Sequence, residues 1–457
     1  MLKYWQLIRS SFWFIPGLMT SGAAMLALGM VALDQAKSEE WLESVGFAYT
    51  GGAEGATTVL GTIAGSMITI AGVVFSMTLV ALSLASSQLG PRLLRNFMRD
   101  QINQVVLGTF VATFIYCLLV LRTIRREEGD VFVPHLAVTL GVVLAVVSVG
   151  VLIYFIHHIS LAIQADQIVA RVGRELTDGI DDLFPDHLDP STRPSRSGGD
   201  NSDIPPDFDS EARPVLASRD GYVQSVDIEA LRKLATEKDV VFRVERAPGT
   251  YVVEHRPLTY VWPAVRVTEE LARRVNSTFV LGSSRTPGQD LQFSVDQLVE
   301  IAVRALSPGV NDPFTAVRCV DRLGSALCRL AQREIPSPHH YDAHHRLRVI
   351  HPPETFPAVL DTAFNQIRQN AASNAAVLIR LLETLAVVAT FVERAEDREA
   401  LRRHAKTMAR VAERGLTEEE DLSAVNQRHA AVMEVLDRPT EENAHLRLRH
   451  GQPAATP

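Results

Sequence analysis

The sequence predicts an integral membrane α-helical protein in which four transmembrane helices precede a cytoplasmic α+β region. Two observations support this fold class. The hydrophobic residues gather before residue 160 in four stretches long enough to cross a bilayer, and shorter β-type and helical patterns begin after residue 214. The overall composition, 47% hydrophobic and 21% charged, is therefore a blend of two kinds of segment.

The second apolar stretch, Ala56–Leu89, carries no charged residue. At about 1.5 Å per residue it exceeds the roughly 30 Å hydrocarbon core, so the predicted helix tilts, kinks or extends beyond the lipid. Its hydroxyl residues recur at spacings of three, four and seven, which places them on one helical face. This stripe consists of Thr58, Thr62, Ser66, Thr69, Ser76, Ser83 and Ser87.

The hydroxyl stripe has two explanations. Small residues allow close helix packing, and the GxxxG spacing of Gly61 and Gly65 fits that role. Alternatively, the stripe faces water and lines a pore or substrate path, with Thr62, Ser66, Thr69, Ser76 and Ser83 as the lining candidates. Because this helix contains no acid, lysine or histidine, a proton relay through it is disfavoured.

Three other spans are predicted, at 10–33, 104–121 and 135–155. The first could be a cleaved signal peptide, but it is long enough to span and no small-x-small cleavage site follows it. Residues 34–54 hold one lysine against five acids, whereas 91–100 hold three arginines, so both termini are expected in the cytoplasm of a bacterium with the protein in its inner membrane. The arginine-rich segment itself reads as an interfacial helix or a collar at the mouth of a path.

Composition changes divide the chain further. We predict a transmembrane domain at 1–160, a cytoplasmic extension of the fourth helix at 161–184 and a flexible linker rich in Pro, Ser and Asp at 185–214. A β-rich subdomain at 215–290, a helical subdomain at 291–440 and a disordered tail at 441–457 follow. The short apolar run VVATF near residue 390 is expected to be core rather than a fifth span.

Two local patterns stand out in the soluble region. The phrases DGYVQSVD and PGTYVVEHRPL resemble the half-motifs of barrel-sandwich domains of the lipoyl type, but without a lysine at the hairpin tip they imply no swinging-arm cofactor. Ser294 and Gln297 have the spacing of a capping box, which predicts a helix opening there.

The most distinctive soluble stretch is RALSPGVNDPFTAV. Pro308 and Gly309 are expected to end one helix, while Asp312 caps the next with Pro313 at its first position, an arrangement that needs no ligand. The functional alternative is a ligand or subunit-interface site, with the loop after Gly282 joining it. Its candidate residues are Arg285, Arg304, Ser307, Asn311 and Asp312.

The sequence lacks the usual catalytic motifs, so we do not expect an enzyme. It has no Walker phosphate loop, GxSxG elbow, HExxH or Rossmann glycine fingerprint. The net charge of −8 disfavours nucleic-acid binding, and the three cysteines form no metal motif. The histidines of HHYDAHH, His339 to His345, have ligand-like spacing but are expected to form a surface connector, so neither a metal nor a cofactor is predicted.

Residues 290–327, DLQFSVDQLVEIAVRALSPGVNDPFTAVRCVDRLGSAL, and residues 75–100, FSMTLVALSLASSQLGPRLLRNFMRD, carry a family resemblance. With them the chain resembles the bacterial predicted membrane proteins grouped as domain of unknown function 2254, although Val310 stands where Ile is expected. The resemblance covers nearly the whole chain. It implies an inner-membrane protein with a cytoplasmic C-terminal region, and it implies no activity.

Two functions remain open at this stage. In the first, the chain forms a homo-oligomer in the lipid bilayer around its second helix and makes a path for an ion or small solute, which the cytoplasmic region regulates. In the second, the membrane part only anchors a cytoplasmic binding or signalling module for an unknown partner. The hydroxyl-faced helix favours the first, and the large soluble region is compatible with both.

Overall fold

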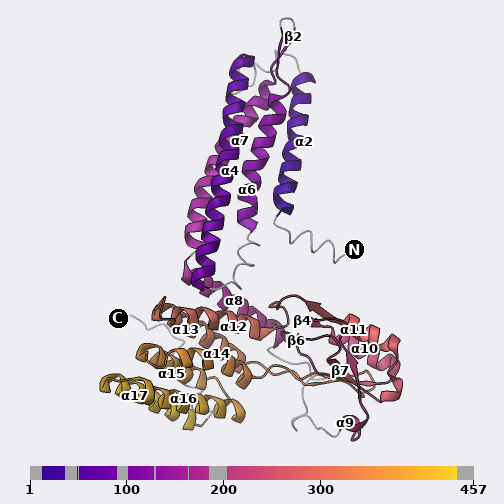
Figure 1. The fold of residues 1–457 in the computed structure, drawn as a ribbon, viewed down its shortest axis with the longest axis vertical. Coiled ribbons are helices and arrows are strands. Elements are labelled where there is room, and N and C mark those ends of the chain that lie inside the picture. Colours follow the sequence, from indigo (N-terminus) through magenta and orange to yellow (C-terminus); the bar gives the residue numbers. More distant parts are fainter. Residues whose placement is uncertain are drawn as a thin grey trace. The chain divides into compact units, whose positions relative to one another are not determined.

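The computed structural model describes residues 13–36, 49, 51–89, 101–127, 130–162, 164–184 and 203–439. Contacts divide the chain into two compact units, residues 1–167 and 168–457. The predicted fold class is confirmed, because four helices long and apolar enough to cross a membrane precede a mixed region of helices and small sheets (Figure 1). The predicted arginine-rich interfacial segment at 91–100 and the tail at 441–457 lie outside the described residues.

The first unit is a bundle of four long helices with a small hairpin. The helices are α2 (Phe14–Ala36), α4 (Ala53–Leu89), α6 (Gln101–Leu121) and α7 (His135–Ala162), and the hairpin strands are β1 (Arg125–Glu127) and β2 (Asp130–Phe132). Helix α6 packs against the other three. Half of its apolar window is buried, compared with 17% to 28% for the others, so α6 is the centre of the bundle.

Polar contacts fix the end of the bundle at which α7 begins. The first N–H groups of a helix have no partner within it. Asp34, at the end of α2, accepts hydrogen bonds from the backbone N–H groups of Leu136 and Ala137, both at 3.0 Å. The Tyr116 hydroxyl of α6 donates to the Ala137 carbonyl at 2.9 Å. The Asp34 carboxylate thus caps α7 and joins it to α2, while the Tyr116 hydroxyl joins α7 to α6.

The second unit takes in most of α8 (Ala165–Leu183). This helix is separate from α7, whereas the sequence predicted an extension of the fourth helix at 161–184. One face of this helix is apolar, and its residues Ile168, Val172, Leu176 and Ile180 are all buried. This face packs within the second unit, where a Cβ on Gly173 would lie 3.2 Å from the Arg322 Cβ. Asp181 pairs with Arg329 at 2.8 Å and with Arg333.

Among the described residues, eight strands and three of the short helices form the β-rich part. The strands are β3 (Arg213–Leu216), β4 (Gly221–Val226), β5 (Val241–Val244), β6 (Tyr251–Val252), β7 (Pro257–Trp262), β8 (Phe279–Gly282), β9 (His339–Tyr341) and β10 (Leu347–Ile350). The helices are α10 (Ile228–Lys238), η3 (Ala264–Arg266) and α11 (Glu269–Thr278). The sheet orders are β3-β7-β5-β10-β9 and β6-β4-β8. Leu231, Phe242, Leu258 and Val275 lie in their shared core.

Two sequence boundaries differ from the prediction. Strands β9 and β10 come from the predicted helical subdomain, yet β10 pairs in parallel with β5 and completes the larger sheet. Residues 203–214 belong to the predicted linker, but they contain α9 (Phe208–Glu211) and the start of β3. Phe208 is buried against Val241, Leu347 and Ile350. The sheet therefore takes in chain from both sides of the expected β-rich segment.

The rest of the second unit is helical. Its helices are α12 (Leu291–Ala305), α13 (Pro313–Ala331), α14 (Phe356–Asn370), α15 (Ala375–Ala389), α16 (Ala395–Gly415) and α17 (Glu419–Asp437). The predicted capping box is wrong, because the Asp290 side chain caps α12 by accepting from the Phe293 N–H, and Ser294 is buried inside the helix. The VVATF run forms the end of α15, with Val388 and Ala389 buried as expected of core residues.

Candidate functional site

The hydroxyl stripe of α4 faces directly away from the bundle. At 100° per residue, Leu60, Ala64, Met67, Ala71 and Val74 form the buried face of this helix. The pathway candidates lie on the opposite face and are all exposed in the single chain. They are Thr62, Ser66, Thr69, Ser76 and Ser83. The helix therefore buries its apolar face and leaves its most polar face outside.

Three hydroxyl groups of the stripe donate hydrogen bonds to carbonyl groups of α4 itself. Thr62 donates to the Thr58 carbonyl at 2.7 Å, Ser66 to the Thr62 carbonyl at 2.8 Å and Thr69 to the Gly65 carbonyl at 2.8 Å. A hydroxyl has one donor and two acceptor lone pairs. Because these three donors are engaged one turn back, the oxygens of Thr62, Ser66 and Thr69 keep acceptor capacity toward the outside.

Open space surrounds the glycines of the same face. A Cβ built on Gly61, Gly65 or Gly72 would meet nothing within 4 Å. A shallow groove of about 660 Å³ runs along this part of α4. It is lined by Thr69, Gly72, Val73, Ser76, Met77, Val80, Ala81 and, from α7, Ile159. The stripe is thus a recessed surface with hydroxyl groups along it.

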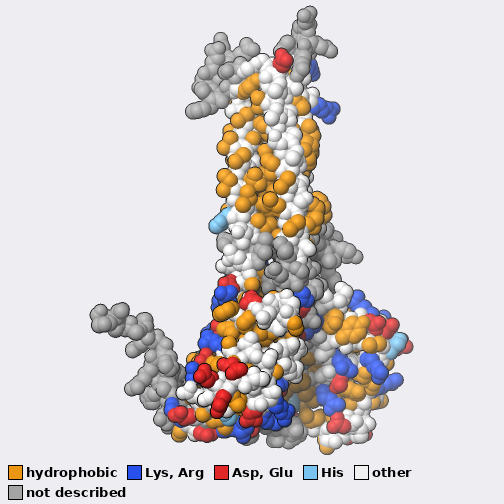
Figure 2. Space-filling model, turned by 60° about the vertical axis from the view of Figure 1, so that its left-hand side comes forward, with side chains coloured by type: hydrophobic (Ala, Val, Ile, Leu, Met, Phe, Trp, Pro, Cys, Tyr) orange, Lys and Arg blue, Asp and Glu red, His pale blue; other side chains and the backbone are white. Residues whose placement is uncertain are grey.

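The outward face of α7 is different. Hydrophobic side chains cover much of the helical unit in Figure 2, and on α7 they are large aliphatic groups. Val146 is 68% exposed and Ile153 is 66% exposed. Such a face suits contact with lipid chains, because apolar surface gains nothing from water. The α4 face differs because small and hydroxyl residues lie among its exposed apolar side chains Val73, Met77 and Val80.

In the soluble unit, Arg285 forms part of an internal ion-pair network. Its guanidinium contacts Asp290 at 2.7 and 2.8 Å and Asp296 at 2.5 Å. The hydrogen bonds to Asp290, with the added contact to Asp296, raise the pKa of Arg285. A Cβ on Gly249, whose φ is +89°, would lie 2.5 Å from Asp290, so glycine is required there. This network joins the loop after β8 to the first turns of α12.

The other soluble candidates meet at the turn between α12 and α13. Asp312 caps α13 by accepting from the Thr315 N–H at 3.1 Å, with Pro313 in the first turn, which confirms the predicted cap. The Thr315 hydroxyl also donates to Asp312, and these hydrogen bonds lower the pKa of the carboxyl group. Ser307 donates to the Arg304 carbonyl at 2.6 Å, and Asn311 adopts the left-handed conformation at φ +48°.

The structure brings four of the five soluble candidates together and leaves Arg285 apart from them. Arg285 binds Asp296, whereas Arg304 lies eight residues further along α12, about 12 Å away at about 1.5 Å per residue. The arrangement at the turn is that of a closed helix connection, and the interactions of Ser307 and Asp312 are internal. Two apolar side chains at this turn, Val310 and Phe314, are exposed.

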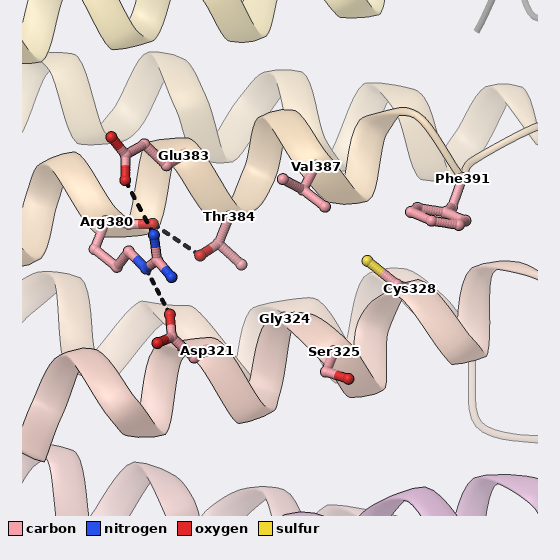
Figure 3. Close-up of a pocket in the computed structure, with 9 residues that line it drawn as sticks. All are labelled: Asp321, Gly324, Ser325, Cys328, Arg380, Glu383, Thr384, Val387 and Phe391. Atoms are coloured by element: carbon pink, nitrogen blue, oxygen red, sulfur yellow. Dashed lines mark hydrogen bonds and ion pairs between the residues drawn. The ribbon is translucent and has the colours of Figure 1, made fainter. Parts of the chain in front are cut away.

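A pocket that sequence reasoning missed lies between α13 and α15 (Figure 3). Its volume is about 370 Å³. One end is polar, where Arg380 contacts Asp321 at 2.5 Å and Glu383 at 3.3 Å. The other end has Cys328, Val387 and Phe391. No local sequence pattern predicts this pocket, because its walls, residues 321–328 and 380–391, are far apart in the sequence and meet only through helix packing.

The chemistry of this pocket does not suggest catalysis. Burial raises the pKa of Cys328 to about 12, so the thiol stays protonated and is a poor nucleophile. The Arg380 guanidinium is already paired with both carboxylates. A ligand here would therefore have to be mainly apolar, since the charges of the polar end bind one another.

The first part of the histidine-rich stretch belongs to a sheet, which corrects the prediction of a surface connector there, whereas His344 and His345 lie in an exposed turn. His339 to Tyr341 form the edge strand β9. Burial alone would raise the pKa of Asp342, but hydrogen bonds from the Arg346 and His344 N–H groups and from the Arg348 guanidinium lower it to about 2. Among the described residues, no group of three or more His, Cys, Asp or Glu side chains is arranged to hold a metal.

Comparisons with known proteins agree on the family and give no activity. The family described as "Predicted membrane protein (DUF2254)" matches residues 9–387. An uncharacterised protein of Mycobacterium bovis and one of Mycobacterium tuberculosis are each 33% identical over 443 residues, which is 94% of this chain and 82% of theirs. No solved structure matches the chain.

Proposed function

We propose, from the premise that this chain belongs to the predicted membrane protein family DUF2254, that several copies assemble through α4 and form a path for cations. In this assembly the hydroxyl stripe faces the shared axis, and the neighbouring surfaces of α4 contact the next copy. The observation that carries the proposal is the outward, recessed face of α4 with its Thr and Ser side chains. The protein is then a channel or transport path rather than an enzyme.

The contrast with α7 supports assembly through α4. Close helix contact in membranes favours small residues, because they let backbones approach and gain dispersion energy. Gly61, Gly65 and Gly72 provide that space on α4. In contact with lipid alone, these positions would gain nothing from being small. A second copy of the chain fills such a face better than lipid chains do.

The hydroxyl geometry supports a cation as the solute. Since Thr62, Ser66 and Thr69 donate inward to their own helix, they offer oxygen acceptors to whatever lies outside. Oxygen acceptors replace the hydration shell of a cation, whereas an anion needs donors. Glu54 lies one turn before Thr58 on this face, is exposed, and adds negative charge at the beginning of α4. Water or a neutral hydroxylated solute would be the next best fit.

The charge of the connecting segments supports a bacterial inner-membrane location with both termini in the cytoplasm. The second unit, which follows α7, then lies in the cytoplasm. Its dense ion pairs suit an aqueous compartment, as do its exposed charged helices. In this arrangement the soluble unit is placed to regulate the path from the cytoplasmic side.

The test is ion flux through the purified full-length protein in liposomes. Ser76 lines the groove, so Ser76→Leu should reduce potassium flux by about tenfold while the oligomer remains. Thr109→Leu is the matched control, because Thr109 lies on α6 and also donates to its own helix, to the Val105 carbonyl at 2.9 Å. Potassium should pass faster than chloride. Absence of flux at varied voltage and divalent concentration would contradict the proposal.

A membrane-anchored binding module is the second candidate, and the pocket between α13 and α15 favours it. Its apolar end includes Val387, which is 55% exposed. If the protein passes no ions, this pocket becomes the next site to test. Val387→Arg should then abolish binding of an apolar ligand, identified by mass spectrometry of material that copurifies with the wild-type protein, while the fold is retained.

A further inference from the structure

A second recess of the soluble unit lies in the β-rich part, where the chain passes from β5 to β7. Its volume is about 390 Å³, and all of its lining residues come from the single stretch 245–260. This stretch includes the whole of β6 and the beginning of β7. Sites for small organic ligands typically have volumes of about 300–1,000 Å³. We call this hollow the β5–β7 recess.

Backbone hydrogen bonds hold the chain around the β5–β7 recess. The Gly249 N–H donates to the Val223 carbonyl at 2.8 Å, and the Val223 N–H donates to the Thr250 carbonyl at 2.9 Å. On the other side of the recess, the Ala217 N–H donates to the Arg256 carbonyl at 2.9 Å. A wall that is already ordered loses little conformational entropy when a ligand binds to it.

Two arginine side chains line the β5–β7 recess. The Arg246 Nε–H donates to the Pro257 carbonyl at 3.4 Å, and Arg256 directly precedes Pro257, so the two arginines start from neighbouring backbone. Among the described residues neither guanidinium forms an ion pair, whereas Arg243 on β5 pairs with Asp209 at 2.6 Å. A phosphate group matches such a pair of guanidinium groups, because its oxygens accept several charge-assisted hydrogen bonds at once.

Two tyrosine rings also line the β5–β7 recess. Tyr251 lies on the edge strand β6 and is 53% exposed. Its ring meets the Tyr222 ring in a T-shaped contact, with the ring centres 5.0 Å apart, which helps to hold it in place. The Tyr260 ring already contacts the Arg243 guanidinium, 5.4 Å from the ring centre. Tyr251 therefore offers the more open surface, and a planar group could stack on it.

The remaining charged residue of the β5–β7 recess is Glu245. Its side chain is exposed and forms no ion pair among the described residues, including with the two arginines of the recess. A carboxylate would repel a simple anion, but it accepts hydrogen bonds from sugar hydroxyl groups, as an acidic residue does in many nucleotide sites. The recess therefore combines groups suited to a phosphate, a planar ring and a sugar.

We propose that the β5–β7 recess binds a nucleoside phosphate. The phosphate lies against Arg246 and Arg256, the base stacks on Tyr251, and the ribose hydroxyls face Glu245. No other single small ligand class uses all three kinds of group so directly. The proposal goes beyond the proposed ion path and does not depend on it, because every residue of the recess belongs to the second unit and binding is measured without flux.

The test is isothermal titration calorimetry of ADP into the purified full-length protein in detergent. Arg246→Gln and Arg256→Gln should each weaken ADP binding by about tenfold or more, because each removes charge-assisted hydrogen bonds to phosphate. The matched control is Arg273→Gln, since Arg273 is an exposed arginine on α11 outside the recess. The control variant should bind ADP like the wild type. Circular dichroism verifies that all three variants remain folded.

Parts of the nucleotide test the three contacts separately. Ribose 5-phosphate lacks the base and adenosine lacks the phosphate, so each should bind about tenfold more weakly than ADP or worse. Tyr251→Leu should weaken the binding of ADP and leave that of ribose 5-phosphate unchanged. Equal affinity for inorganic phosphate and ADP would overturn the proposal. So would the absence of ADP binding at millimolar concentration, or ADP binding that both recess variants retain.

Discussion

The outward faces of α4 and α7 belong to one four-helix bundle and differ in chemistry. On α7 the exposed side chains include Val142, Val146, Val149 and Ile153. On α4 the residues opposite the buried face are mainly Thr, Ser and Gly, with a groove along them. Lipid chains cannot distinguish these faces by hydrogen bonding, so a bundle that met lipid all round would have no reason to keep them different.

The difference indicates that a single chain does not provide every surface that the α4 helix is suited to contact. A face of large aliphatic groups is satisfied by lipid. A face of small residues and oxygen acceptors gains only when a protein surface or water meets it. Helices α6 and α7 pack on one face of α4, whereas the stripe on the opposite face is exposed in the part of the chain that the structure describes. We expect that another copy of the chain covers the stripe face of α4.

Cross-linking should give the largest contrast. With Ser76→Cys in vesicles, a short bis-maleimide should join most chains into dimers, because the proposed assembly places these positions near one another. Val146→Cys on α7, at the lipid-facing surface, should give almost none. Gel electrophoresis measures the outcome. Equal cross-linking from both faces would remove the basis for treating them differently.

A large side chain on the small face should weaken assembly. Gly65→Leu places four extra carbons where α4 is expected to meet the next copy, and overpacking typically costs about 1–3 kcal/mol, or about fivefold to 150-fold in the dissociation constant. Gly150→Leu on α7 is the control, since a Cβ there also meets nothing within 4 Å. Analytical ultracentrifugation in detergent should show dissociation for the first variant alone. If both variants assemble like the wild type, α4 is not the interface.

Much of this membrane unit could be predicted because its signals are local. Apolar length and the spacing of hydroxyl residues predicted α4 and its stripe, and both depend only on neighbours in the sequence. The direction in which the stripe faces could not be predicted, since it depends on how α6 and α7 pack. Asp34 shows the same limit, because its partners at the start of α7 are about a hundred residues away.

The soluble unit was less predictable for the same reason. The cap at Asp312 was found because a cap and its helix are adjacent in sequence. Strand β10 was missed, because its parallel partner β5 is about a hundred residues earlier and its sequence is short and contains arginine. The choice of Ser294 as a cap also failed, since Asp290 offers a carboxylate one turn earlier and already binds Arg285. Of these three cases, only the missed strand depended on a contact between residues far apart in the sequence, whereas the caps at Asp312 and Asp290 are local.

Mild acid should lower the stability of the soluble unit without changing the ion flux along the stripe. The stripe from Thr58 to Ser83 has no titratable carboxylate or histidine, whereas burial, with a further contribution from His340, lowers the pKa of His351 from its ordinary 6.5 to about 4. The folded state then binds fewer protons than the unfolded state between these values. Stability is full above about pH 6.5 and falls as the pH drops toward 4, by about 2 kcal/mol at pH 5.

Thermal unfolding followed by circular dichroism at pH 7.5 and pH 5 measures this effect. His351→Leu should unfold at temperatures that differ less between the two pH values than those of the wild type. Other buried histidines, such as His404, add to the remaining dependence. Potassium flux per folded protein should stay the same over this range. A pH-dependent flux without any change in the fold would place a titrating group on the path. It would contradict the expectation that only the soluble unit responds to pH in this range.

The smallest expected effect distinguishes the two roles that the α4 face can have. Thr69→Val keeps the shape of the side chain and removes only the hydroxyl that donates to the Gly65 carbonyl. If the stripe lines the path, the solute loses one oxygen acceptor, and potassium flux should fall by about twofold to tenfold, as expected for one hydrogen bond of about 0.5–1.5 kcal/mol. Thr109→Val on α6 should change nothing. Assembly should be unaffected, because the packing volume is kept. An unchanged flux in Thr69→Val, together with weakened assembly, would mean that the hydroxyls serve helix packing and that the path lies elsewhere.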